Sequence, residues 1–525
     1  MQREIETDVL IVGLGGAGAC AAIEARHAGA DVVVLERFTG GGATAISGGV
    51  VYAGGGTFIQ QDAAVTDDVE DMFRYLQLEV GDVVSDEVLR DFCEHSASNL
   101  RWLAEQGAVF DSALCPVKTS YPTDDYFLYY SGNEGFSPYR DAAKPAPRGH
   151  RVRGKSLPGR NLFAPLQAQV HRLGAQVHYH SRVQRLLVDN GRVQGVEASI
   201  VQSGVWSKLH GWLEKYAIKL VNYMPRQARK LRRWGRAIEV RHGITVRAMA
   251  RRGVILSAGG FVTNRDMISK FAPKYRPGMP LGTAGCSGDG IRMGLDAGGA
   301  VSEMKRVSAW RFLNPPEAFV HGVLLNRSGE RYVNESLYGA AVGEAMVEDN
   351  GGVGILVIDE GLRKLAKSQV GRGKTQWFQT GPALLNLWFN CRRADNVAAL
   401  AAICRCPEAS LQQTLDDYNS AIESGEPDAY GKELRSALAP PFFAIDCSIT
   451  SRMWPLPTLT LGGLVVCEES GQVCDEDGAP IPGLYSAGRN ALGICSRQYV
   501  SGLSIADCVY SGRRAGRSAA SATTL

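Results

Sequence analysis

Short apolar runs near both ends of the chain predict strands of an α/β sheet. Residues 9–12 (VLIV) and 31–35 (DVVVL) are such runs, and the small-residue stretch between them is long enough for one helix. Residues 250–257 show the same pattern, a strand that runs into a small-residue turn. A strand, a helix and a second strand in this order are typical of a βαβ unit.

A glycine-rich turn follows the first of these strands. Gly13, Gly15 and Gly18 form the pattern G-x-G-x-x-G, and the second strand ends at the acidic residue Glu36. The first glycine permits a tight turn, the second lets backbone amides approach a pyrophosphate, and the third allows close packing of the helix. The helix N-terminus favours phosphate, and Glu36 is placed to accept hydrogen bonds from ribose hydroxyls. This acid favours FAD or NAD over NADP.

A second glycine-rich stretch, residues 40–56 (GGGATAISGGVVYAGGG), favours FAD. A flavin needs backbone that passes close to its ribityl chain and ring, and glycine permits that approach. Further small-residue turns at 250–261, 483–489 and 501–507 are expected to return to the same sheet. The residues expected to contact FAD are Gly13, Gly15, Gly16, Ala17, Gly18, Glu36, Arg37, Ala43, Thr44, Ser47, Gly48, Gly49, Val183, Ala258, Gly259, Gly488, Arg489, Gly502, Leu503, Ser504 and Ile505.

Length and composition are those of a globular protein with two or more domains. The chain has 525 residues, of which 45% are apolar and 21% charged. No apolar run approaches the roughly 18 residues of a membrane span. The 12 cysteines are scattered without a CxxC pair, so we expect neither disulfides nor a metal site. No signal peptide is visible, so we expect a cytoplasmic protein.

Positive charge is concentrated in residues 204–241. This segment has ten Lys or Arg residues against Glu214 and Glu239, or about +8, whereas the whole chain carries +3, a distribution that does not suggest nucleic-acid binding. Apolar residues at intervals of three or four predict an amphipathic helix that ends before Pro225: Trp206, Leu209, Leu213, Tyr216, Leu220 and Tyr223. An aromatic face beside dense positive charge fits a peripheral anchor on the inner face of the cell membrane. The alternatives are a helix that covers the enzyme's own surface and a subunit contact.

Several motifs spread over nearly the whole chain carry a family resemblance. They are the N-terminal fingerprint, CSGDGIRMGLDAGG (286–299), GERYVNE (329–335), TLGGL (460–464), IPGLYSAGR (481–489) and SGLSIADCVYSGRRAG (501–516). With this combination the chain resembles the fumarate reductase and ketosteroid dehydrogenase superfamily of flavoproteins. The resemblance implies an α/β, Rossmann-like FAD-binding domain built from residues 1–283 and 443–525. An α+β catalytic domain inserted at 284–442 would cap the flavin.

The chain departs from the dicarboxylate-binding members where they would hold a small dianion. Those members use arginine and histidine, but Tyr338 and Gly339 stand where the proton-relaying arginine is expected. The stretches RMWPLPTLTLGGL (452–464) and KRVSAWRFLNPPEAF (305–319) contain no histidine. A dianion without a cationic clamp is poorly bound, so we expect no dicarboxylate chemistry. GGATAISGG (41–49) also lacks the histidine of covalently flavinylated members, so the resemblance implies noncovalent FAD.

The chain is most similar to the bacterial 3-ketosteroid Δ4-(5α)-dehydrogenases. Four features carry this likeness: PAPRGH (145–150), ERYVNESLYG (330–339), LYSAGRNALGIC (484–495) and the pattern Tyr-x-Ser-Gly-x-Ser from Tyr499 to Ser504. The resemblance implies that Tyr338, Tyr499 and Ser501 are the catalytic set. The related Δ1-dehydrogenases use an additional, earlier tyrosine, which Tyr129 or Tyr130 can imitate. Δ1 chemistry and reduction of another apolar enone therefore stay open, as does a flavin-binding, membrane-associated scaffold without turnover.

Desaturation next to a ketone requires a base for the α-proton, a hydride acceptor and a group that stabilises charge on the carbonyl oxygen. The motifs offer no obvious His, Lys or carboxylate base, and a phenol, with a pKa near about 10, needs assistance. We therefore expect Tyr499 to be the base and Ser501 its helper, with Tyr338 a hydrogen-bond donor or pocket wall near the keto group. No second dinucleotide fingerprint is evident, so we expect electrons to pass to a quinone or a redox protein rather than to NAD(P)H.

Overall fold

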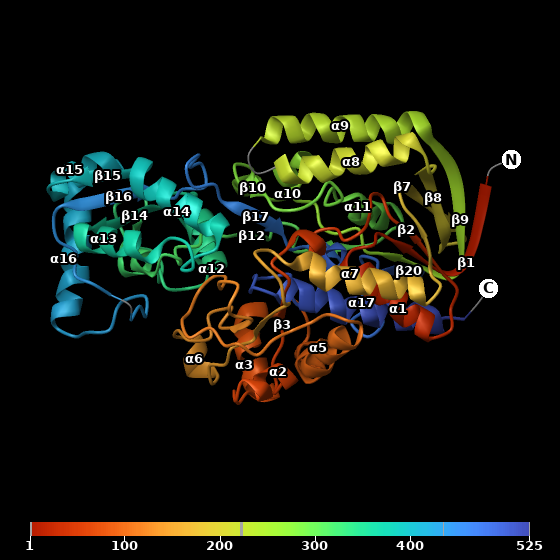
Figure 1. The fold of residues 1–525 in the computed structure, drawn as a ribbon, viewed down its shortest axis with the longest axis horizontal. Helices are drawn as coiled ribbons and strands as arrows, with labels where there is room; N and C mark the ends of the chain where they lie inside the picture. The colour runs from red at the N-terminus through yellow and green to blue at the C-terminus, as the bar shows by residue number, and fades with distance from the viewer. Residues whose placement is uncertain (1–2, 221–223, 434, 524–525) are drawn as a thin grey trace.

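The computed structural model describes residues 3–220, 224–433 and 435–523 and contains one large sheet that joins both ends of the chain. Parallel pairs build its centre in the order β20–β9–β1–β2–β6, and β19, β8 and β7 add antiparallel pairs. Figure 1 shows both termini at the same end of the molecule. The strands are β1 Arg3–Val12, β2 Val32–Leu35, β6 Gln176–His178, β7 Ser181–Asp189, β8 Arg192–Val201, β9 Gly243–Leu256, β19 Gln472–Cys474 and β20 Pro480–Ser486.

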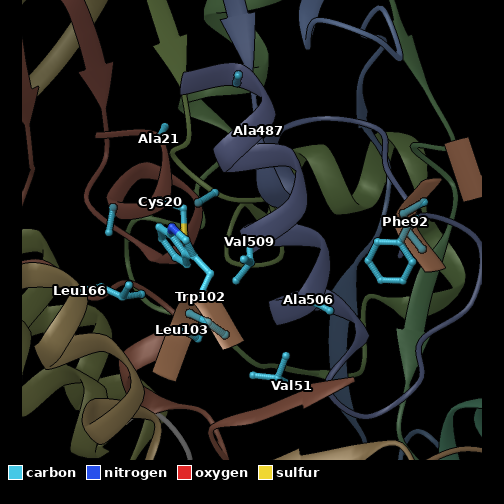
Figure 2. Close-up of a cluster of buried hydrophobic side chains, with 14 of the residues drawn as sticks. Cys20, Ala21, Val51, Phe92, Trp102, Leu103, Leu166, Ala487, Ala506 and Val509 are labelled. Atoms are coloured by element: carbon cyan, nitrogen blue, oxygen red, sulfur yellow. The ribbon is translucent and has the colours of Figure 1, made fainter. Parts of the chain in front are cut away.

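Two helices from opposite ends of the chain, α1 (Gly16–His27) and α17 (Leu503–Ser521), pack against each other beside this sheet. Small residues set their distance, because a Cβ at Gly512 or Gly516 would lie 2.5 or 2.4 Å from a carbonyl oxygen of α1. Figure 2 shows Val509 of α17 in one buried cluster with Cys20 and Trp102. The last helix therefore fastens the C-terminus to the N-terminal nucleotide-binding unit.

Residues between β2 and β6 form a helical layer and a small antiparallel sheet, β3–β5–β4. Tyr129 ends β4 and pairs with Gly149 of β5. The elements are η1 Thr44–Ile46, β3 Val50–Tyr52, α2 Phe58–Asp62, α3 Val69–Val80, α4 Asp86–Glu94, α5 Ser96–Glu105, β4 Leu128–Tyr129, α6 Tyr139–Ala142, β5 Gly149–Arg151 and α7 Gly159–Arg172.

A second unit is built on the antiparallel sheet β13–β14–β16–β15, and Figure 1 shows it at the end of the molecule opposite to the large sheet. Strand β16 ends at Asp446, so this sheet extends four residues beyond residue 442, the expected end of the inserted catalytic domain. Its elements are η3 Glu317–His321, β13 Val323–Leu325, α12 Gly339–Glu344, η4 Ala345–Asp349, β14 Ile355–Asp359, α13 Glu360–Gln369, α14 Trp377–Phe389, β15 Cys391–Ala394, α15 Val397–Cys404, α16 Glu408–Glu423 and β16 Phe442–Asp446. This α+β unit has its own buried apolar core.

Two small sheets, β10–β17–β12 and β11–β18, bring together segments from before and after the second unit. The remaining elements are α10 Arg265–Phe271, η2 Pro273–Tyr275, β10 Met279–Pro280, α11 Asp289–Asp296, β11 Val301–Ser302, β12 Val307–Ala309, β17 Pro457–Thr460, β18 Gly463–Leu464 and η5 Gly488–Asn490. The chain thus enters and leaves the second unit through these two small sheets.

The basic segment between β8 and β9 is a hairpin of two helices, α8 (Val205–Leu220) and α9 (Pro225–His242). The first helix confirms the predicted periodicity, although Tyr223 lies outside the described residues. Helix α8 ends at Leu220, and Pro225 stands at the first position of α9. The proline therefore begins a second helix, which the sequence did not predict. Trp206, Leu209 and Tyr216 of the predicted apolar face are exposed. The buried face of α8 is mostly polar or small: Ser207, His210, Leu213, Glu214 and Ala217.

Candidate active site

The turn after β1 has the geometry of a phosphate site. Helix α1 begins at Gly16 with no side-chain cap from its N-cap residue and no acidic residue in its first turn, so the positive end of the helix is not neutralised locally and favours an anion. Gly13 has φ +99, and a Cβ at Gly18 would lie 2.0 Å from the Gly13 carbonyl oxygen. Both positions therefore require glycine, as the fingerprint predicts.

Glu36 lies just beyond β2 and is buried. Its Oε2 accepts a hydrogen bond from the Leu14 amide at 2.7 Å, and its Oε1 accepts one from the Phe38 amide at 2.8 Å. Burial raises the pKa of this carboxyl group, and the backbone amides oppose that shift. The side chain of Arg37 points elsewhere, since its guanidinium pairs with Glu239 at 2.7 Å.

The remaining segments expected to contact FAD converge on the same edge of the sheet. The Gly16 amide donates to Thr44 Oγ1 at 3.2 Å, and Ser257 Oγ donates to the Gly13 carbonyl at 2.9 Å. The first contact brings residues 43–49 to the turn, and the second brings Ala258 and Gly259. The Ser181 amide donates to the Glu36 carbonyl at 2.8 Å, which brings Val183 of β7 close to the end of β2.

The C-terminal segments complete this site. A Cβ at Gly488 would lie 2.9 Å from the Ala17 side chain, and Nη1 of the neighbouring Arg489 is buried without a hydrogen-bond partner. Helix α17 begins at Leu503 after Gly502, at φ +92, without a side-chain cap or an acidic residue in its first turn. Two uncapped helix N-termini and an unsatisfied arginine fit an extended anionic dinucleotide such as FAD.

The three expected catalytic residues lie together at the start of α17, where a fourth hydroxyl joins them. The Tyr129 hydroxyl lies 3.0 Å from Ser501 Oγ. Burial raises the pKa of Tyr338 well above its usual value, and the neighbouring Tyr499 and Tyr129 raise it further. A hydrogen bond with Ser501 acts in the opposite direction. Ser501 is therefore the centre of a cluster of three phenols. Its hydroxyl is hydrogen-bonded to Tyr129 rather than to Tyr499.

The sequence left open whether Tyr129 or Tyr130 joins the site. Tyr129 is fully buried on β4 and reaches Ser501, whereas Tyr130 follows the strand and is half-buried. Neighbouring residues of an extended chain point in opposite directions, so only one of the two can face the cluster. That alternation was the available signal, but sequence alone does not say which face is inside.

Aromatic side chains wall the cluster on another side. The ring of Trp310 lies 4.8 Å from that of Tyr499, and the ring of Phe312 lies 5.3 Å from that of Tyr338. Arg311, between them in the chain, is fully buried and donates to the Trp454 carbonyl at 2.9 Å. The segment that lacks the histidine of the dicarboxylate-binding members thus presents aromatic surface, which no motif of the sequence indicates.

Burial keeps the phenols neutral. It raises the pKa of Tyr499 and Tyr129 above the usual tyrosine value. The Tyr338 amide donates to Asn133 Oδ1 at 2.6 Å, which fixes the backbone that carries this phenol. Within residues 3–220, 224–433 and 435–523, no group of three His, Cys, Asp or Glu side chains is placed to hold a metal ion.

Comparisons with known proteins agree with this geometry. A family model described as FAD binding domain matches residues 8–499. The chain is 40% identical over 496 residues to the 3-oxo-5-alpha-steroid 4-dehydrogenase of Comamonas testosteroni, covering 92% of each chain. It is 25% identical over 530 residues to a fumarate reductase (cytochrome) of Shewanella frigidimarina, covering 98% of this chain and 77% of that one.

Solved structures show the same fold over the full length. The crystal structure of 3-ketosteroid-delta4-(5alpha)-dehydrogenase from Rhodococcus jostii RHA1 in complex with 4-androstene-3,17-dione matches with a TM-score of 0.81 and 30% identity, covering 99% and 100% of the two chains. The 3-ketosteroid delta1-dehydrogenase of Sterolibacterium denitrificans matches with a TM-score of 0.65 and 18% identity, covering 98% and 99%. FAD is the cofactor of this chain, which belongs to the FAD binding domain family and is similar to the 3-oxo-5-alpha-steroid 4-dehydrogenase over nearly its whole length.

Proposed function

We propose that this flavoenzyme desaturates a 3-keto-5α-steroid between C4 and C5. The observation that carries the proposal is the hydroxyl cluster at Ser501 facing the aromatic pair Trp310 and Phe312. Apolar, planar substrates pack well on such rings, and phenols can bind a ketone oxygen and exchange protons. The 40% identity to a 3-oxo-5-alpha-steroid 4-dehydrogenase supports this substrate class.

The residues divide the chemistry between proton transfer and carbonyl binding. Tyr499, as the phenolate, takes the C4 proton, and Ser501 stabilises that phenolate or relays its proton. Tyr338 donates to the keto oxygen, and backbone amides of the turn 499–502 share that role. When bound, FAD supplies the acceptor for the hydride that leaves C5. The loss of one proton and one hydride leaves a double bond conjugated with the ketone.

Anaerobic mixing with candidate substrates tests the substrate class. We expect 5α-androstane-3,17-dione to bleach the flavin absorbance of the holoenzyme, whereas succinate does not. Bleaching by succinate alone would contradict the proposal. No bleaching by either compound would favour the scaffold without turnover.

An external acceptor completes the catalytic cycle. We propose a quinone or a redox protein, because the chain offers one dinucleotide fingerprint and the FAD site uses it. We also propose that FAD is held noncovalently, since residues 41–49 offer no histidine for attachment. Denaturation in acid should release all flavin into the supernatant, and a short-chain quinone, but not NAD⁺, should reoxidise the steroid-reduced enzyme.

The outer face of the hairpin α8–α9 supports peripheral attachment to a membrane. Its exposed side chains combine Trp212 at 49% and Trp234 at 58% exposure with exposed lysines and arginines of both helices. Both acidic residues of the segment are buried, so they do not offset this charge. None of the described helices has the length and apolarity to cross a bilayer. Anionic lipid is therefore the complementary partner.

Vesicle sedimentation tests this attachment. We expect binding to vesicles that contain phosphatidylserine, and loss of binding in a Trp212→Ser/Trp234→Ser variant. A Lys364→Gln/Lys367→Gln variant on α13 is the control for surface charge. Equal sedimentation of wild type and the tryptophan variant would assign the hairpin to a protein contact instead.

A further inference from the structure

The inner face of the hairpin α8–α9 buries ionisable groups, which is costly unless they are paired. Glu214 and Glu239 are 6% and 3% exposed, and His210 is 1% exposed. Glu239 and His210 contact residues around the end of β2, and Glu214 contacts the Ala284 amide and Arg232 of α9. A helix that merely covered a surface would bury apolar side chains here, so this polar face has a specific partner.

Glu239 holds Arg37, the residue after Glu36. Its two carboxylate oxygens accept from Arg37 Nε at 2.7 Å and Nη2 at 3.0 Å, the paired geometry that makes such contacts strong. His210 Nε2 lies 3.1 Å from the same carboxylate. Burial opposes ionisation of Glu239, yet the hydrogen bonds with His210 and Arg37 lower its pKa to about 2. The pair is therefore charged at neutral pH.

The hairpin also reaches two other segments of the cofactor site. Arg182, beside Val183, lies 3.8 Å from Glu239, and Glu214 Oε1 accepts from the Ala284 amide at 3.1 Å. Asp289, five residues further, lies 3.6 Å from Arg37. The loop around Ala284 is itself tied to the turn after β9, since the Gly288 amide donates to the Gly260 carbonyl at 3.1 Å.

Aromatic packing closes the remaining side of this contact. His210 stacks on Phe38 with ring centres 5.3 Å apart, and its Nδ1 lies 3.0 Å from His180 Nδ1. Phe38 and His180 flank the end of β2, since the His180 amide donates to the Phe38 carbonyl at 3.3 Å. The hairpin thus contacts the residues just after Glu36 and those just before Val183.

We propose that the hairpin α8–α9 is a clamp on the adenosine half of FAD, with Glu239 as its central positioning residue. In dinucleotide-binding folds the acid at the end of the second strand binds the adenosine ribose, and here the hairpin holds the residues just after Glu36 and those just before Val183. Arg37 pairs with Glu239, and Arg182 lies 3.8 Å from it. Glu36, whose oxygens accept from the Leu14 and Phe38 amides, therefore keeps its remaining acceptor capacity for the ribose. The clamp slows loss of FAD and does not depend on which substrate the enzyme oxidises.

Cofactor affinity measured with two flavins tests the clamp. FMN carries the same ring and one phosphate but no adenosine, so the clamp should matter for FAD alone. We expect Glu239→Gln to raise the Kd for FAD about tenfold or more, by flavin fluorescence on the apoprotein, and to leave the Kd for FMN within about twofold. Glu197→Gln is the matched control, because Glu197 pairs with Arg185 at 2.8 Å on the exposed side of β7–β8.

Two results would overturn the proposal. One is an unchanged Kd for FAD in Glu239→Gln, and the other is an equal loss of FAD and FMN, which indicates general loosening of the fold. Should Glu239→Gln not fold, Glu214→Gln weakens the contact with the Ala284 amide and removes the charge that faces Arg232 of α9 at 3.7 Å, and it should shift the FAD Kd alone by a smaller factor. Flavin bleaching by steroid can still occur in any variant loaded with excess FAD, so the clamp and the steroid chemistry fail separately.

Discussion

Tyr499→Phe is the sharpest perturbation of the proposed chemistry, because it removes one oxygen atom and keeps the ring. That ring packs on Trp310 at 4.8 Å, so the pocket wall and the affinity for an apolar substrate should survive. A positioned base contributes about 10²–10⁴ in rate, which corresponds to roughly 2.7–5.4 kcal/mol of the barrier. The rate constant for flavin reduction by 5α-androstane-3,17-dione should fall by this factor, with the apparent steroid Kd changed less than about threefold.

The pH dependence of flavin reduction by the steroid also tests whether Tyr499 is the base. Burial raises the pKa of Tyr499, so the phenol is protonated at neutral pH and its reactive, deprotonated fraction grows as pH rises. Flavin reduction by the wild type should therefore speed up with pH between about 6 and 9, and the residual rate of Tyr499→Phe should not. Tyr130→Phe, a change of the same size at a half-buried tyrosine, is the control. A Tyr499→Phe rate within about fivefold of wild type would refute the base assignment.

Three further predictions concern substrate binding and stability. Trp310→Ala should raise the steroid KM about tenfold or more by removing an aromatic wall, measured in steady state with an artificial acceptor. Glu335→Gln should cost about 3–5 kcal/mol of unfolding free energy, because the buried Lys432, 3.0 Å away, loses its carboxylate and Arg331 keeps only Asp428; chemical denaturation measures this. The pKa of Glu239 is lowered to about 2, so its stabilising effect is present above about pH 4.3 and is lost as pH falls toward 2. The difference in unfolding free energy between wild type and Glu239→Gln should narrow over that acid range.

The cofactor half of the site could be predicted from sequence because its determinants are local. Gly13, Gly18 and Glu36 follow strands whose apolar runs are visible in the chain, and the structure places them at one sheet edge. Their glycine requirement is a backbone property, which a short motif records directly. Gly502 at the start of α17 follows the same rule.

The substrate half depends on contacts that sequence does not encode locally. Tyr129 and Ser501 are 372 residues apart in the chain and meet only because β4 and α17 dock on the same unit. The sequence of residues 305–319 shows that histidine is absent there. It does not show which way Trp310 points, so the aromatic wall could not be predicted.

The hairpin illustrates a limit of helical periodicity. The spacing predicted helix α8, but the helix turns Trp206 and Tyr216 to solvent and buries His210 and Glu214. Periodicity identifies two faces, and the polar groups that attract the buried one lie on distant segments such as Arg37. The contact between Glu239 and Arg37 therefore required the structure.

The position of the new double bond tests the central claim most directly. The holoenzyme is incubated with 5α-androstane-3,17-dione and an artificial electron acceptor, and the product is analysed by proton NMR. A C4–C5 double bond leaves a single vinylic proton, on C4, and this is the result that we predict. Two coupled vinylic protons, on C1 and C2, would show Δ1-desaturation and contradict the proposed function.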